Sequence, residues 1–110
     1  LLELPAGGIE PLETENAAAA RELREETGYR AEKMLSLGGF FIAPGYSTEY
    51  MYAYAGMNLL FDPLKPDFDE FIEIVELTWT SVIKFIEEGI IRDAKTIAAL
   101  FIANLILQKK

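Results

Sequence analysis

The chain of 110 residues contains no cysteine and no histidine. The absence of cysteine excludes disulfide bonds and a thiol nucleophile. The absence of histidine removes the most common general base and any zinc site with histidine ligands. Any chemistry performed by this chain must therefore rely on carboxylates, metal ions and water.

Basic residues and long apolar runs are also scarce. There are 10 Lys and Arg against 18 Asp and Glu, which leaves a net charge of −8. This excess of negative charge disfavours nonspecific binding to nucleic acids or to anionic membranes. The longest apolar run, Ile97–Ala103, is far too short to cross a bilayer. We therefore expect a cytoplasmic protein that binds neither nucleic acid nor membranes.

The pattern of apolar and turn-forming residues predicts a single α+β domain over residues 1–110. Period-2 alternation indicates strands, while capping residues and glycines mark the ends of helices. The expected elements are a strand at Leu1–Leu4, a helix at about Thr14–Thr27, a strand within Ala31–Ala43, a turn at Pro44-Gly45, a strand within Glu49–Leu60, a loop at Asp62–Asp69, an alternating segment at Glu70–Thr78, a helix from Thr80 or Ser81 to Glu88 and a helix from Asp93 to about Gln108.

Three local features allow two interpretations each. The pair Gly38-Gly39 predicts a bulge or a close backbone approach within its strand. The last helix is apolar nearly all round, which indicates either packing against the sheet or a subunit interface. The tyrosines of the strand within Glu49–Leu60 favour packing on one sheet face over a platform for stacking bases.

One run near the start of the chain has an unusual spacing of glycines, glutamates and arginine. It follows the register G-x5-E-x7-R-E-U-x-E-E-x-G-U, in which U is a bulky apolar residue. A chance match to the seven fixed letters has a probability on the order of 10⁻⁷ per starting position at this chain's own Gly, Glu and Arg frequencies. The fixed positions and the first U are filled by Gly7, Glu13, Arg21, Glu22, Leu23, Glu25, Glu26 and Gly28.

The chain resembles the Nudix hydrolases, whose signature has this register, with Tyr29 at a final position that is usually aliphatic. In the predicted helix, Glu22, Glu25 and Glu26 share one face, where like charges repel each other. A hard divalent cation such as Mg²⁺ would reverse that repulsion, because it takes oxygen ligands. Arg21 can pair with Glu25 one turn later in the helix.

The resemblance implies a Nudix fold, a mixed β-sheet sandwiched between helices, and we expect further strands upstream of Leu1. It also implies Mg²⁺, with Mn²⁺ as an alternative, held by Glu22, Glu25, Glu26 and the carbonyl group of Ala6. In this interpretation Arg21 and Glu25 belong to the catalytic machinery, and Glu13 orients the helix.

The segment FIAPGYSTEYMYAYAG resembles the part of ADP-ribose pyrophosphatases that follows the signature. The segments DEFIEIVEL and IRDAKTIAALFI resemble the carboxyl-terminal half of the same subgroup. This likeness implies that Glu49 hydrogen-bonds the terminal ribose, although an ordinary strand-edge charge is the alternative. It implies Gly7 and Gly45 as further substrate-binding residues, and Glu70 as the general base with Glu73 as second choice.

The function predicted from these resemblances is Mg²⁺-dependent hydrolysis of ADP-ribose to AMP and ribose 5-phosphate. Another nucleoside diphosphate sugar or related nucleotide is the nearest alternative substrate. The alternative from a different class is a noncatalytic module that binds a nucleotide. The expected partner is thus a nucleoside diphosphate-linked small molecule, and the family likeness implies a homodimer.

Overall fold

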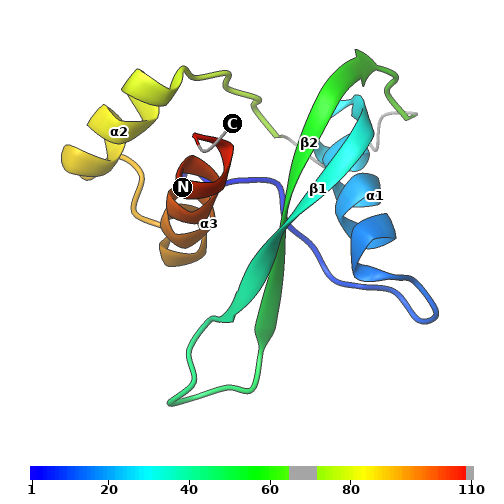
Figure 1. Cartoon of the computed structure of the whole chain (residues 1–110), viewed down its shortest axis with the longest axis horizontal. Coiled ribbons are helices and arrows are strands. Elements are labelled where there is room, and N and C mark those ends of the chain that lie inside the picture. The colour runs from blue at the N-terminus through cyan, green and yellow to red at the C-terminus, as the bar shows by residue number, and fades with distance from the viewer. Residues whose placement is uncertain (65–71, 109–110) are drawn as a thin grey trace. The chain divides into compact units, whose positions relative to one another are not determined.

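The computed structural model describes residues 1–64 and 72–108, and the expected α+β class is confirmed. Its described residues group into two compact units. The first takes Leu1–Leu4, Leu37–Ala53 and the described part of Val75–Lys110, and the second takes Pro5–Ser36 and the described part of Tyr54–Ile74. The elements in chain order are α1 (Glu15–Thr27), β1 (Tyr29–Phe41), β2 (Tyr50–Phe61), α2 (Trp79–Glu87) and α3 (Ala94–Leu107), as Figure 1 shows.

The strands β1 and β2 form a two-stranded antiparallel sheet, a long hairpin that contributes residues to both units. The predicted turn at Pro44-Gly45 is confirmed, because the carbonyl of Ala43 accepts hydrogen bonds from the amides of Tyr46 and Ser47, both at 2.9 Å. The predicted close approach is confirmed at Gly39, where a Cβ atom would lie 2.6 Å from the carbonyl oxygen of Met51.

Helix α1 begins and ends where the sequence predicts. The Thr14 hydroxyl accepts a hydrogen bond from the Ala17 amide at 3.1 Å, which satisfies one of the free donors of the first turn. At the other end Gly28 adopts φ 78°, and its amide donates to the carbonyl of Arg24. Leu23 packs against the backbone of Gly56 on β2 within the second unit. The helix is therefore capped at both ends and anchored to the sheet through an apolar contact.

The two carboxyl-terminal helices confirm one predicted cap and correct another. Asp93 caps α3 as predicted, because its side chain accepts from the Thr96 amide. Helix α2, however, is capped by Thr78 and not by Thr80 or Ser81. The Thr78 hydroxyl accepts from the Ser81 amide at 3.2 Å, so the helix starts earlier than predicted.

Two predicted extended segments are not strands. Leu1–Leu4 has no regular structure, and the amide of Leu4 donates to a side chain, Thr96, in place of a neighbouring strand. Residues 72–78 of the alternating segment also have no regular structure, and Ile72, Ile74 and Val75 are exposed. Alternation alone does not make a strand, because the backbone needs a partner for its hydrogen bonds. Much of the predicted Asp62–Asp69 loop lies outside the described residues.

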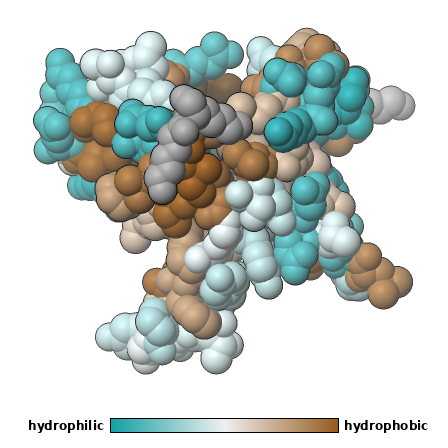
Figure 2. Space-filling view, in the orientation of Figure 1, coloured by the Kyte–Doolittle hydropathy of each residue, from teal (hydrophilic) through white to brown (hydrophobic). Residues whose placement is uncertain are grey.

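The last helix is only partly buried. Thr96, Ala99 and Ala103 are buried, whereas Phe101 and Leu105 are 63% and 49% exposed. Figure 2 shows hydrophobic surface over α3. One side of the helix is therefore buried, and the expected homodimer stays a prediction. None of the helices in residues 1–64 and 72–108 combines the length and the apolar character needed to cross a membrane.

Replacing Gly28 with alanine should destabilise the protein by about 1–2 kcal/mol, because a residue with a Cβ atom is strained in the left-handed region. The added atom would also lie 3.2 Å from the ring of Phe61. Urea unfolding of the full-length protein would measure the loss. Gly45→Ala is the control, since its Cβ atom would meet nothing within 4 Å. Equal effects of the two substitutions would contradict this account of Gly28.

Candidate active site

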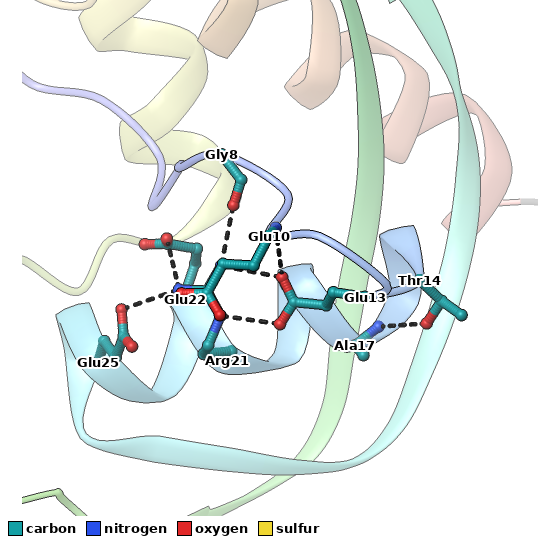
Figure 3. Close-up of polar contacts among 8 residues, drawn as sticks. All are labelled: Gly8, Glu10, Glu13, Thr14, Ala17, Arg21, Glu22 and Glu25. Atoms are coloured by element: carbon teal, nitrogen blue, oxygen red, sulfur yellow. Dashed lines mark hydrogen bonds and ion pairs between the residues drawn. The ribbon is translucent and has the colours of Figure 1, made fainter.

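The guanidinium group of Arg21 lies at the centre of the signature residues (Figure 3). Its Nε and Nη2 atoms donate to the two carboxylate oxygens of Glu13 at 2.8 and 3.1 Å. Such a forked pair fixes the guanidinium plane as well as its position. Glu13, in the loop before α1, therefore orients Arg21 on the second turn of that helix.

The remaining donors of Arg21 reach three other groups. Nη1 donates to Glu22 at 2.9 Å and to Glu25 at 3.2 Å, so the predicted pairing of Arg21 with Glu25 is present. Nη2 also donates to the carbonyl of Gly8 at 2.8 Å. One guanidinium thus joins two glutamates of the helix face to the glycine loop, and it offsets the repulsion between them.

The segment before the helix is held close to this cluster. The Ala6 amide donates to Oε2 of Glu26 at 3.0 Å. A Cβ atom added to Gly7 would collide with the Glu22 carboxylate, so only glycine leaves room for that side chain. The Glu10 amide donates to Glu13 at 2.9 Å. The loop therefore contacts several carboxylates of the signature through its own backbone.

The same contacts shift the pKa values of Glu13 and Arg21. Hydrogen bonds from Arg21, and then from the backbone of Glu10, hold the pKa of Glu13 below its ordinary value. In return, the hydrogen bond to Glu13 raises the pKa of Arg21 above its already high value. Both groups are therefore charged at neutral pH, which preserves the pair.

The donor chemistry of the helix face fits a hard divalent cation. Glu22, Glu25 and Glu26 carry six carboxylate oxygens in the second unit, next to the loop that contains Ala6. In the part of the chain that the structure describes, no three acidic side chains are arranged as a metal-binding group. Glu22 and Glu25 bind Arg21 instead. The predicted ligation by these residues and by the Ala6 carbonyl stays a prediction.

The predicted substrate-binding residues lie in different parts of the chain. Gly7 is next to Glu22, whereas Gly45 and Glu49 belong to the exposed loop between β1 and β2 in the first unit. The Glu49 backbone is tied within that loop, because its amide donates to Ser47 and its carbonyl accepts from the Ile42 amide. Its side chain is exposed. The predicted ribose contact is not tested by these observations.

Of the two candidates for the general base, Glu70 lies outside the described residues, and Glu73 is exposed in a segment without regular structure. The choice between them stays a prediction.

Sequence reasoning missed a second ionic cluster next to the motif. Arg24 donates from Nε to the Asp62 carbonyl at 2.7 Å and pairs with the Asp62 carboxylate at 3.2 Å. Arg30 reaches the same carboxylate at 3.3 Å. These partners are more than 30 residues apart along the chain, so no local spacing reveals them.

Comparison with known proteins identifies the family. The NUDIX domain family model matches residues 1–100. The chain belongs to the Nudix family. Members of this family generally use divalent metal ions.

Individual Nudix relatives have related but different names. The chain is 35% identical over 102 residues to an ADP-ribose pyrophosphatase of Bacillus subtilis (strain 168), covering 91% of this chain and 55% of the relative. It is 34% identical over 109 residues to a GDP-mannose pyrophosphatase of Yersinia pestis (strain Pestoides F), and the match covers 96% of this chain and 54% of that relative. A crystal structure of an ADP compounds hydrolase aligns with a TM-score of 0.82 at 28% identity, and the alignment covers 92% of this chain and 55% of that one. The chain thus spans about half the length of these relatives.

Acid should weaken the contribution of Glu13 to stability. Because the folded-state pKa of Glu13 is lowered, its stabilising effect is complete above the unfolded-state pKa of about 4.3 and is lost as the pH falls through the folded-state value. We expect Glu13→Gln to reduce the slope of unfolding free energy against pH below about pH 4. Urea unfolding between about pH 3 and pH 6 would measure it. Wild-type and variant curves of the same slope would contradict the assignment.

Proposed function

We propose that this chain is the signature-bearing part of a divalent-metal-dependent hydrolase that splits ADP-ribose into AMP and ribose 5-phosphate. The observation that supports this most is the Arg21 cluster, which joins Glu13, Glu22, Glu25 and the carbonyl of Gly8. A chain with the Nudix signature keeps here the oxygen-rich helix face that a cation would need. The similarity to an ADP-ribose pyrophosphatase supports the choice of substrate.

The residues proposed to hold the cation, Mg²⁺ or Mn²⁺, are Glu22, Glu25, Glu26 and the Ala6 carbonyl. When bound, a divalent ion supplies Lewis acidity toward the diphosphate and lowers the pKa of a coordinated water. Oxygen ligands of this type suit Mg²⁺.

The chain's own residues would set the geometry of that site. Glu13 holds Arg21 through the forked pair, and Arg21 in turn limits the freedom of Glu22 and Glu25. In many metal sites, supporting contacts of this kind orient the side chains that bind the metal directly. The proton of the attacking water would pass to a carboxylate outside the helix, Glu70 or Glu73.

The substrate's sugar end is proposed to meet the loop between β1 and β2. Glu49 offers an exposed carboxylate on a backbone fixed by two hydrogen bonds. A carboxylate accepts hydrogen bonds from neutral hydroxyl groups but repels a third phosphate. This favours a nucleoside diphosphate linked to a sugar over a nucleoside triphosphate.

Two other functions remain as alternatives. The GDP-mannose pyrophosphatase relative favours another nucleoside diphosphate sugar as substrate. A noncatalytic nucleotide-binding module is the second, but such a module has no need of a mutually repelling glutamate face. Metal-dependent turnover in the full-length protein separates an enzyme from a module.

Glu26→Gln should lower turnover by at least ~10²-fold, the size expected when an electrostatic group of the active site is lost. The glutamine keeps an oxygen that can accept from the Ala6 amide, so the fold should persist. Released AMP at saturating Mg²⁺ would measure the rate. The matched control is Glu32→Gln, an exposed charge on β1. Near wild-type turnover by Glu26→Gln would refute its proposed role.

The full-length protein should prefer ADP-ribose to dATP or dGTP by at least ~10-fold in kcat/KM, which is about 1.4 kcal/mol of differential transition-state binding. Glu49→Ala should shrink that preference while leaving the Mg²⁺ requirement unchanged, and Glu32→Ala should not. A panel including GDP-mannose would measure all of these rates. Faster cleavage of GDP-mannose would favour the alternative sugar nucleotide, and faster cleavage of the triphosphates would overturn both.

A further inference from the structure

A polar cluster at the start of α3 does more than cap the helix. The Asp93 carboxylate accepts from the Thr96 amide at 3.2 Å and from the Thr96 hydroxyl at 2.6 Å. The first bond is the ordinary cap. The second fixes the direction of the hydroxyl group, since its only proton points at Asp93. The lone pairs of a side chain only 3% exposed are thereby aimed elsewhere.

The hydroxyl oxygen of Thr96 accepts a hydrogen bond from the amino-terminal segment. The Leu4 amide donates to Oγ1 of Thr96 at 3.2 Å, 92 residues away in sequence. Next to it, Lys95 donates to the Glu3 carboxylate at 3.1 Å and to both oxygens of Asp93 at 3.0 Å. The first turn of α3 is thus hydrogen-bonded to two successive residues, Glu3 and Leu4, of a segment that has no regular structure.

The gripped segment leads directly into the glycine loop. Pro5 alone separates Leu4 from Ala6, whose amide donates to Glu26 at 3.0 Å. The proline ring fixes φ at that residue, which removes one of the backbone dihedrals through which Ala6 could move relative to Leu4. Gly7, the next residue, is next to the Glu22 carboxylate.

We propose that Thr96, supported by Asp93 and Lys95, is a positioning residue that holds Glu3-Leu4 and so restrains the glycine loop at Ala6. Its consequence for cation binding rests on the proposed function, whereas the restraint itself does not. A side chain that only capped α3 would stabilise that helix and leave the loop unchanged. The two roles therefore differ in what happens at the Ala6 amide.

Hydrogen exchange in the metal-free, full-length protein is the direct test. Thr96→Val keeps the shape but removes both hydrogen-bonding functions of the hydroxyl. We expect exchange at the Leu4 and Ala6 amides to be about 5–10-fold faster, the size of one lost hydrogen bond. Thr96→Ser should restore near wild-type rates. Thr80→Val, an exposed threonine on α2, is the control.

Faster exchange at Leu4 with an unchanged rate at Ala6 would overturn the proposal and leave only a helix cap. If Thr96→Val does not fold, Lys95→Met decides, because it removes the grip on Glu3 and keeps the Asp93 cap. An Ala6 rate at least about twofold faster in that variant supports the restraint, and an unchanged rate overturns it.

Calorimetric titration with Mg²⁺ alone tests the consequence for the cation. Half-saturation should require about 10-fold more Mg²⁺ in Thr96→Val than in wild type, at the lower end of the range seen when supporting contacts of a metal site are lost. An unchanged affinity alongside faster Ala6 exchange would overturn the proposed link to the cation. If the wild-type protein neither binds Mg²⁺ nor turns over any substrate, the proposed function fails, and the exchange measurement still judges the restraint.

Discussion

The rest of the site depends on one forked ion pair, between Arg21 and Glu13. A helix face with several glutamates is electrostatically unfavourable by itself. The guanidinium compensates for this because its donors are rigidly spread and reach several acceptors at once. Glu13 sets the plane of the guanidinium group, and Glu22 and Glu25 then pair with Nη1 of that group in a defined orientation.

Glycine and backbone contacts extend that order into the preceding loop. The absence of a side chain at Gly7 lets the Glu22 carboxylate lie against the main chain. The Gly8 carbonyl accepts from Arg21, and the Ala6 amide donates to Glu26. A loop without regular structure lacks the backbone partners of a helix or a sheet, so side chains and water take their place. Here the side chains that bind the Gly8 carbonyl and the Ala6 amide belong to the signature helix. The loop and the helix face therefore form one hydrogen-bonded arrangement.

Local signals predicted well where the physics is local. The ends of α1 follow from Thr14 and Gly28, because capping and positive φ depend on a few neighbouring residues. The cap of α2 was misplaced by only a few residues, since Thr78, Thr80 and Ser81 all have hydroxyl groups. Extended segments were harder, because a strand exists only with a partner. Leu1–Leu4 was wrongly predicted as a strand for that reason.

The sequence by itself determined the family register, the helix that carries it and the pairing of Arg21 with Glu25, since all of these rest on spacing within a few turns. Only the tertiary structure decided which distant groups meet. Thr96 receives the Leu4 amide and Asp62 receives two arginines because folding brings residues far apart in the chain to within hydrogen-bonding distance. Those contacts have no sequence period, because their geometry depends on the packing of whole elements.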